Sequence, residues 1–321
     1  MPEITKTFYA LGTINTIQAY GAGGTAAAQL AADRVFEIHN RLSVFLEGSD
    51  IFRLNANAGA GPVRIHPETC RLLKLALEYS AASSGAYDVT VRPLTSLWSI
   101  GHGGNSIPPE DAIRSALEKT GYRNLILYEN ESAAELKACG QSVDLGGIAK
   151  GYAGDEARRI LSENGVQDAL INLGGNIVAM GCNPRGNPWR IGVQNPLRPR
   201  GESLLTLSVQ DACVVTSGVN ERFFMKNGVR YHHILDPRTG MPVQNSLLSA
   251  TVISASGTDA DALSTALFVT GGFEHGEERT DMCGIENLMK RSDATAIFIN
   301  EDLKVIQTRF PGGECAAEAT E

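Results

Sequence analysis

Apolar residues recur along the chain at spacings that distinguish helices from strands. Residues 25–45 carry the first helical pattern. Within them, Val35, Ile38 and Leu42 lie three or four positions apart, which is typical of one face of an amphipathic helix. The same spacing, with proline or acidic starts and glycine ends, predicts further helices over 67–82, 108–120, 148–163, 258–270 and 284–290.

Short apolar runs between polar or glycine-rich breaks predict strands. These runs cover 8–17, 124–128, 134–138, 142–145, 169–173, 189–193, 204–207, 230–235, 248–254, 295–299 and 303–308. Gly12 interrupts the first run, which predicts a bulge or a close backbone approach. Because strands and helices do not alternate strictly, the pattern predicts an α+β fold with mixed or antiparallel sheets and packed helices.

The composition is that of a soluble globular protein. Of 321 residues, 43% are hydrophobic and 20% are charged, which excludes disordered, collagen-like and disulfide-scaffold chains. The net charge of −8 argues against nucleic acid as a partner, because phosphate binding needs a basic surface. No linker divides the chain, so we expect one domain over 1–310, followed by a disordered acidic tail at 311–321.

The sequence shows no sign of membrane insertion or export. No apolar run approaches the ~18–20 residues that span a bilayer, and the start of the chain lacks the pattern of a signal peptide. The six cysteines have no CxxC spacing, which indicates free buried thiols in a reducing compartment. We therefore expect a cytoplasmic protein. The alternative is an exported protein whose signal has been removed.

A glycine pair follows a predicted strand in residues 144–152, with sequence DLGGIAKGY. The glycines allow close backbone approach, the helix that follows favours an anion at its start, and Lys150 adds a positive charge. The segment therefore suits a phosphate. An ordinary strand-to-helix turn explains it equally well.

Asp261 and Thr265 lie four positions apart on one face of the helix predicted from Thr258. A carboxylate and a hydroxyl are hard oxygen ligands that suit Mg²⁺. The competing interpretation is helix capping, with Thr258 as the N-cap and acidic residues in the first turn.

His232 and His233 face opposite sides of a predicted strand, so one is expected to pack in the core while the other faces a cleft. A histidine titrates near neutrality and suits general-base chemistry. The chain has no spaced set of Cys and His to complete a zinc site. A structural histidine remains the alternative.

Residues 86–94, AYDVTVRPL, combine an aromatic ring with an acid. Tyr87 is placed to stack on a ligand ring, and Asp88 to accept a hydrogen bond from an exocyclic amine. The alternative is the start of an ordinary strand.

Taken together and in this order, the segments resemble the FAD:protein FMN transferase family, the ApbE-type flavin transferases. The matching text spans about residues 8–270 and comprises LGT (11–13), AYDVTVRPL (86–94), DLGGIAKGYAGD (144–155), NLGGNI (172–177), TSG (216–218), HHILDPRTGMP (232–242) and DADALSTALF (259–268). The resemblance implies an α+β fold of two intimately joined lobes, with a cleft that binds FAD beside Mg²⁺.

The resemblance also implies roles for single residues. It places Asp261, Thr265 and the carbonyl of Gly147 among the Mg²⁺ ligands, and His233 at the position of the base. The residues it assigns to flavin dinucleotide binding are Ala86, Tyr87 and Asp88 at the adenosine, Asp144 and Lys150 near the flavin or phosphates, Ile234 beside the base, and Leu11 and Phe45 at the flavin ring. Leu11 stands where the family usually has Met.

The implied reaction moves FMN from FAD to a Thr or Ser hydroxyl of a target flavoprotein and releases AMP. Mg²⁺ would neutralise the pyrophosphate, and His233 would take the proton of the hydroxyl. Two alternatives stay open at this point. A Mg²⁺-dependent FAD pyrophosphatase would use water as the acceptor, and a non-catalytic flavin-binding protein would bind FAD without metal.

Overall fold

A large antiparallel sheet forms the centre of the molecule. The computed structural model describes residues 3–21, 23–272, 283–309 and 316–319. The largest sheet has eight strands in the order β1-β2-β6-β7-β10-β13-β14-β15, and neighbouring strands run antiparallel. These strands are β1 (Glu3–Ala10), β2 (Thr13–Tyr20), β6 (Asp168–Leu173), β7 (Asn176–Met180), β10 (Ala212–Gly218), β13 (Leu247–Ser254), β14 (Thr295–Asn300) and β15 (Val305–Arg309).

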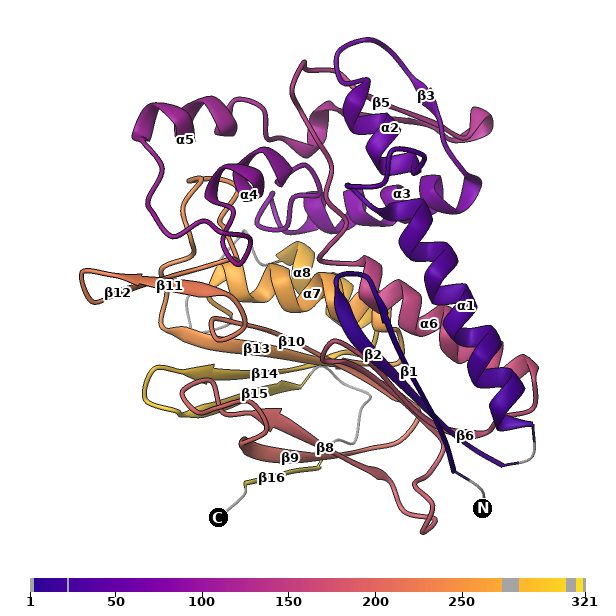
Figure 1. Cartoon of the computed structure of the whole chain (residues 1–321). Helices are drawn as coiled ribbons and strands as arrows, with labels where there is room; N and C mark the ends of the chain where they lie inside the picture. Colours follow the sequence, from indigo (N-terminus) through magenta and orange to yellow (C-terminus); the bar gives the residue numbers. More distant parts are fainter. Residues whose placement is uncertain (1–2, 22, 273–282, 310–315, 320–321) are drawn as a thin grey trace.

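Helices cover one face of this sheet, and a second sheet covers the other (Figure 1). The helices are α1 (Gly24–Leu42), α6 (Ala149–Glu163) and α7 (Gly257–Thr270). The second sheet has the order β16-β9-β8, with β8 (Trp189–Gln194), β9 (Ser203–Val209) and β16 (Ala316–Ala319). Because both faces are covered, all eight residues of β13 are buried, and its sequence lacks polar alternation.

The remaining elements lie mostly beyond the helical layer, towards the top of Figure 1. They are α2 (Asp50–Ala56), α3 (Pro67–Ala82), α4 (Arg92–Trp98), α5 (Glu110–Leu117), α8 (Cys283–Arg291), the sheet β3-β5-β4 (Val63–Arg64, Ala133–Leu136, Leu125–Tyr128) and the hairpin β11–β12 (Phe223–Lys226, Val229–His232). The α+β class with antiparallel sheets is therefore confirmed. None of the described helices is long and apolar enough to cross a membrane.

The first predicted strand is instead a hairpin. Residues 8–17 contain the end of β1, a two-residue turn and the start of β2. Leu11 and Gly12 both have positive φ, 54° and 75°, which matches the right-handed twist of a tight hairpin. Leucine seldom adopts this conformation, so the sequence indicated a bulge where the chain reverses.

Three further segments differ from the sequence predictions. The strand predicted over 230–235 ends at His232, so His233 lies directly after β12 and not within it. Residues 142–145 form no strand, because they share only an isolated bridge between Ser142 and Val91. Residues 86–91 form a loop between α3 and α4 rather than the start of a strand. The seven-residue helices α2 and α4 were not predicted, because they are too short to repeat a helical pattern.

The predicted tail and the predicted burial of the cysteines also need correction. Within 311–321, Ala316–Ala319 form β16, which pairs with the free edge of β9. Backbone groups make this pairing, so it does not require a particular side-chain pattern in the tail. The other tail residues, including Cys315, lie outside the described residues. Cys70 and Cys213 are buried as expected, whereas Cys139 and Cys283 are exposed.

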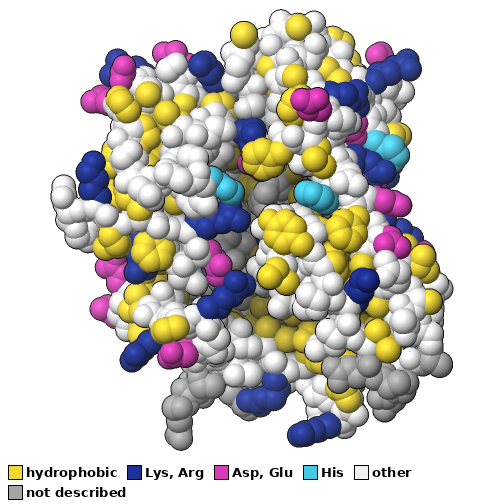
Figure 2. Space-filling view, viewed as in Figure 1, with side chains coloured by type: hydrophobic (Ala, Val, Ile, Leu, Met, Phe, Trp, Pro, Cys, Tyr) yellow, Lys and Arg dark blue, Asp and Glu magenta, His cyan; other side chains and the backbone are white. Residues whose placement is uncertain are grey.

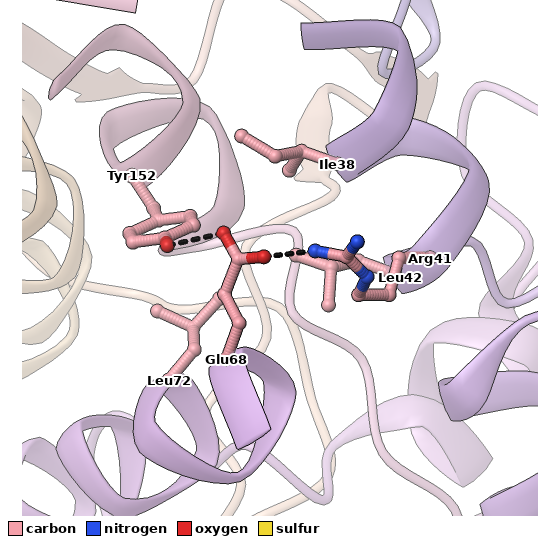
Figure 3. Close-up of a pocket in the computed structure, with 6 residues that line it drawn as sticks. All are labelled: Ile38, Arg41, Leu42, Glu68, Leu72 and Tyr152. Atoms are coloured by element: carbon pink, nitrogen blue, oxygen red, sulfur yellow. Dashed lines mark hydrogen bonds and ion pairs between the residues drawn. The ribbon is translucent and has the colours of Figure 1, made fainter. Parts of the chain in front are cut away.

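A buried carboxylate joins α1, α3 and α6, as Figure 3 shows. Glu68 accepts hydrogen bonds from Arg34 and Arg41 of α1 and from Tyr152 of α6. Arg34 also donates to Glu156 of α6 at 2.8 Å. We call these five side chains the Glu68 junction. They hold α6 in place, and α6 carries Lys150 at its first turn.

Candidate active site

Asp261 lies where α6 and α7 approach most closely. The helices meet at two glycines, and a Cβ added to Gly151 would lie only 2.0 Å from the carbonyl oxygen of Gly257. The absence of that atom lets the Gly151 N–H donate to Asp261 Oδ2 at 2.9 Å. Asp261 is buried at 3% exposure, so its carboxylate is held at the start of α6 with little access to bulk water.

Asp155 on α6 fixes the start of α7. Its carboxylate accepts from the backbone N–H groups of Gly257 and Thr258 at 2.8 and 2.9 Å, and from Thr258 Oγ1 at 2.6 Å. Ser256, not Thr258, is the N-cap, because its hydroxyl accepts from the Asp259 N–H at 3.1 Å. Sequence analysis missed Asp155. Its position one helical turn after Gly151 was the available signal.

Thr265, Gly147 and Tyr87 come together beside Asp261. A Cβ added to Gly147 would lie 3.4 Å from Thr265 Oγ1 and 3.1 Å from Tyr87 Cε2. Thr265 Oγ1 lies 3.3 Å from Ser217 Oγ of β10. The structure therefore brings the three residues expected around Mg²⁺ to one place. Ser217 belongs to the TSG segment, but its contact with Thr265 was not predicted.

Tyr87 carries a buried hydroxyl that has no hydrogen-bond partner among the described residues. Burial, followed by the negative charges of Asp261, Asp144 and Asp88, raises the pKa of this hydroxyl well above its usual value. The ring packs edge-on against Tyr79, with centroids 6.4 Å apart, and the side chain is 4% exposed. Stacking of this ring on a ligand is therefore disfavoured, whereas the hydroxyl retains hydrogen-bonding capacity that no described residue uses.

Lys150 brings positive charge to the same place. Its Nζ donates to the Gly146 carbonyl at 2.9 Å and lies 3.7 Å from Asp261 Oδ1. Asp144 Oδ1 accepts from the Gly146 N–H at 2.8 Å, so the carboxylate orders the glycine turn ahead of α6. A positive charge and a glycine turn at a helix start fit a phosphate group.

Arg92 connects this turn to Phe45. Its Nη1 lies 3.9 Å from Asp144 Oδ2, and its guanidinium lies over the Phe45 ring at 5.2 Å. Phe45 is 72% exposed, which leaves most of the ring open to a flat ligand. Arg92 belongs to the AYDVTVRPL segment, but sequence analysis gave it no role.

The two histidines occupy different environments. His232 is buried, and its Nε2 bonds the Val243 carbonyl at 2.9 Å, so it is the packed member of the pair. His233 Nδ1 lies 3.3 Å from the Arg222 carbonyl. Burial first, then the positive charge of Arg222, the neighbouring His232 and the charge of Lys150, lower the pKa of His233 to about 4. By exposed surface, His233 is the partly exposed member of the pair.

Other predicted residues are not joined to this group by a described contact. Asp88 accepts from the N–H groups of Thr90 and Tyr122 and from the Thr90 hydroxyl, so its carboxylate orders its own loop. Ala86 and Ile234 are buried in the main core, and Leu11 packs at its margin in the β1–β2 turn.

Figure 2 shows a hollow between the two halves of the visible face of the molecule, with basic side chains along it and a histidine on each side. No cluster of three His, Cys, Asp or Glu side chains suited to a metal occurs within the described residues. A hydrated Mg²⁺ needs only one or two carboxylates, because water and substrate phosphates complete its coordination. Asp261, Thr265 and Gly147 fit that donor set.

Comparisons with known proteins identify relatives of this chain. The family model described as the ApbE family matches residues 11–286. A Treponema pallidum protein named FAD:protein FMN transferase is 32% identical, over 96% of this chain and 91% of its own length. A Klebsiella pneumoniae protein of the same name is 36% identical, over 86% and 84%.

A solved structure shows the same fold. The crystal structure of the ApbE protein from Thermotoga maritima superposes with a TM-score of 0.84 at 31% identity, covering 96% of this chain and 97% of that one. The family match covers most of the chain, and it includes the helices that bring Asp261, Thr265 and Gly147 together. This chain belongs to the ApbE family.

Proposed function

We propose that this protein is a Mg²⁺-dependent transferase that moves FMN from FAD to a Thr or Ser hydroxyl of a target flavoprotein and releases AMP. The observation that carries the proposal is the buried Asp261 carboxylate, held by the Gly151 N–H beside Thr265 and Lys150. The names of the relatives support the reaction, and the spare oxygen donors at this point support the metal.

The chemistry is a displacement at phosphorus. The hydroxyl oxygen of the acceptor forms a bond to the phosphorus of the FMN half, the bond from that phosphorus to the bridging oxygen breaks, and AMP leaves with that oxygen. Lys150 binds the negative charge of the pyrophosphate from the start of α6. Asp144 holds the glycine turn open for it.

His233 has the orientation of a base. A carbonyl oxygen only accepts hydrogen bonds, so the contact with the Arg222 carbonyl places the proton of the neutral ring on Nδ1. The Nε2 lone pair is then free to take the proton of the acceptor hydroxyl. The low pKa keeps the ring neutral at pH 7, and the arriving phosphates would raise the pKa as the ring takes up the proton.

Asp261, Thr265 and the Gly147 backbone would hold the metal ion. When bound, Mg²⁺ supplies charge neutralisation at the pyrophosphate oxygens. The chain's part is to keep these donors preorganised, and the Gly151–Gly257 contact and the Asp155 cap do this.

The test is AMP release from FAD with and without Mg²⁺, followed by mass spectrometry of an added flavoprotein acceptor. We expect Mg²⁺-dependent AMP release and a gain of ~438 Da on the acceptor, which is FMN less water as transfer to a hydroxyl requires. AMP and free FMN without a modified acceptor would identify a pyrophosphatase. FAD binding without AMP would identify a flavin-binding protein.

A further inference from the structure

The β11–β12 hairpin directly precedes His233 and carries exposed apolar side chains. Phe223 is 42% exposed and Met225 is 55% exposed. They lie two positions apart on one strand and so share one face of the hairpin. Figure 1 shows this hairpin projecting from the body of the molecule.

The opposite face of the hairpin anchors it to the core. Phe224 stacks on Tyr231 with ring centroids 5.1 Å apart, and Tyr231 stacks on Trp98 of α4 at 6.1 Å. Phe224 and Trp98 are both buried. The exposure of Phe223 and Met225 is therefore a property of a fixed surface, not of a loose loop.

The outer edge of β11 also has backbone N–H and C=O groups that no described strand pairs with. His233 N–H donates to the Arg222 carbonyl, so residues 222, 224 and 226 direct their backbone groups towards β12. Phe223 and Met225 direct theirs away from β12, and no other described strand pairs with this edge. On the far side, the chain after β12 is already paired, because the Val243 N–H donates to the Ile234 carbonyl.

The charge around this edge is positive, although the chain as a whole carries −8. Residues 221–233 include three basic side chains, Arg222, Lys226 and Arg230, and one acidic side chain, Glu221. The Arg230 guanidinium lies 4.6 Å from the centre of the Phe223 ring. An extended segment with apolar and acidic side chains matches this surface in both polarity and charge.

We propose that the outer edge of β11 binds the acceptor protein, taking an extended apolar and acidic segment as a third strand beside Phe223 and Met225. The proposal rests on the proposed transfer reaction. β11 begins directly after Arg222, whose carbonyl holds His233, so a segment that docks on this edge and continues past Arg222 brings its Thr or Ser hydroxyl towards the base. Main-chain hydrogen bonds supply affinity, and the side chains supply selectivity.

The test measures peptide binding by fluorescence anisotropy, which does not depend on FAD cleavage. Three fluorescent peptides have one central Thr each. The first has apolar and acidic flanks, the second replaces the acids with lysines, and the third replaces the apolar residues with serines. We expect the first peptide to bind most tightly and to weaken as salt is raised.

Substitutions at Phe223 and Met225 separate the contribution of the side chains from that of the backbone. Phe223→Ser with Met225→Ser should raise the Kd of the first peptide about tenfold or more, because both apolar side chains lose their contact with the docked segment. Met225→Pro removes an outward N–H and should weaken binding more than Met225→Ala does. Leu197→Ser is the matched control, because Leu197 is 51% exposed in the β8–β9 connection.

The outcomes are distinct. The proposal is overturned if wild-type protein binds none of the peptides, binds all three equally, or keeps the same Kd in the double variant. FAD binding by each variant confirms that it is folded. Failure of wild-type protein to release AMP from FAD counts against the proposed function alone, because the binding measurement stands without it.

Discussion

Two buried carboxylates in this molecule are partnered in opposite ways. Glu68 is 6% exposed and accepts from two arginines and a tyrosine, so both of its oxygens are occupied. Asp261 is 3% exposed and has one backbone N–H at 2.9 Å and a lysine at 3.7 Å. The Tyr87 hydroxyl nearby has no described partner.

The difference separates structural from functional burial. A buried charge is costly unless partners satisfy it, and the Glu68 junction satisfies its carboxylate with side chains of the fold itself. The region around Asp261 retains acceptor capacity and an unpaired hydroxyl, which a positive ion and a phosphate would use. We therefore expect substitutions in the first region to change stability, and those in the second to change activity.

The largest effect is expected for His233→Ala. Loss of a general base typically costs ~10²–10⁴-fold in rate. AMP release and acceptor modification should fall by this amount, while FAD binding and thermal stability stay close to wild type. Normal transfer by the variant would show that His233 is not the base.

The pH profile of the wild-type protein checks the same base. Because the pKa of His233 is lowered to about 4, the ring stays neutral through the range in which an exposed histidine becomes protonated. We expect kcat/KM for FAD to stay flat from about pH 7.5 to 5.5 as far as this group is concerned. A half-maximal rate near the ordinary histidine pKa of about 6.5 would contradict the buried environment.

Asp261→Ala should come next in size, with a loss of activity on the order of 10³-fold, because several kcal/mol of charge stabilisation depend on this carboxylate. The dependence of AMP release on Mg²⁺ concentration should disappear with it. Asp259→Asn is the matched control, since Asp259 lies on the same helix but accepts from Tyr79 at 2.6 Å. An unchanged Mg²⁺ titration in Asp261→Ala would refute the ligand assignment.

Glu68→Gln should lower stability and leave the Mg²⁺ dependence unchanged. Removing the charge takes the buried carboxylate away from Arg41, while Arg34 keeps Glu37 and Glu156. Loss of one member of a buried ion pair typically costs about 3–5 kcal/mol of unfolding free energy. Urea unfolding measures this loss, and the Mg²⁺ titration of the folded fraction should not move. Glu163→Gln breaks an exposed pair with Arg159 and should cost less than about 1 kcal/mol. Equal losses of unfolding free energy in the two variants would show that the Glu68 junction contributes no more stability than an exposed ion pair.

The sequence predicted the parts of the fold that depend on local signals. Helices α3, α6 and α7 begin and end within one residue of the predicted limits, because proline, glycine and capping residues mark their ends. The β1–β2 turn was missed because a leucine adopts the left-handed conformation that Asn or Gly usually takes there. The conformational preference of leucine did not indicate the turn. The pairing of β1 with β2 holds the chain in it.

The site was predictable only in part. Asp261 and Thr265 were found because four positions along a helix bring side chains together. Asp155 and Ser217 were missed because their partners lie far away in sequence: Asp155 binds residues 102 and 103 positions later, and Ser217 lies 48 positions before Thr265. The Glu68 junction was missed for the same reason, since Arg34 and Tyr152 come from different helices.

The smallest expected effect is for Tyr87→Phe, and it tests the comparison most directly. The hydroxyl has no described partner, so its removal should leave the unfolding free energy unchanged or raise it by about 1 kcal/mol, because an unsatisfied buried group costs about 1–3 kcal/mol. Tyr79→Phe should instead lower it, because that hydroxyl donates to Asp259. If the Tyr87 hydroxyl serves a bound ligand, Tyr87→Phe should weaken FAD binding in the presence of Mg²⁺ by a few-fold, measured by flavin fluorescence. Lower stability with unchanged FAD binding would place Tyr87 with Glu68, among the residues that hold the fold together.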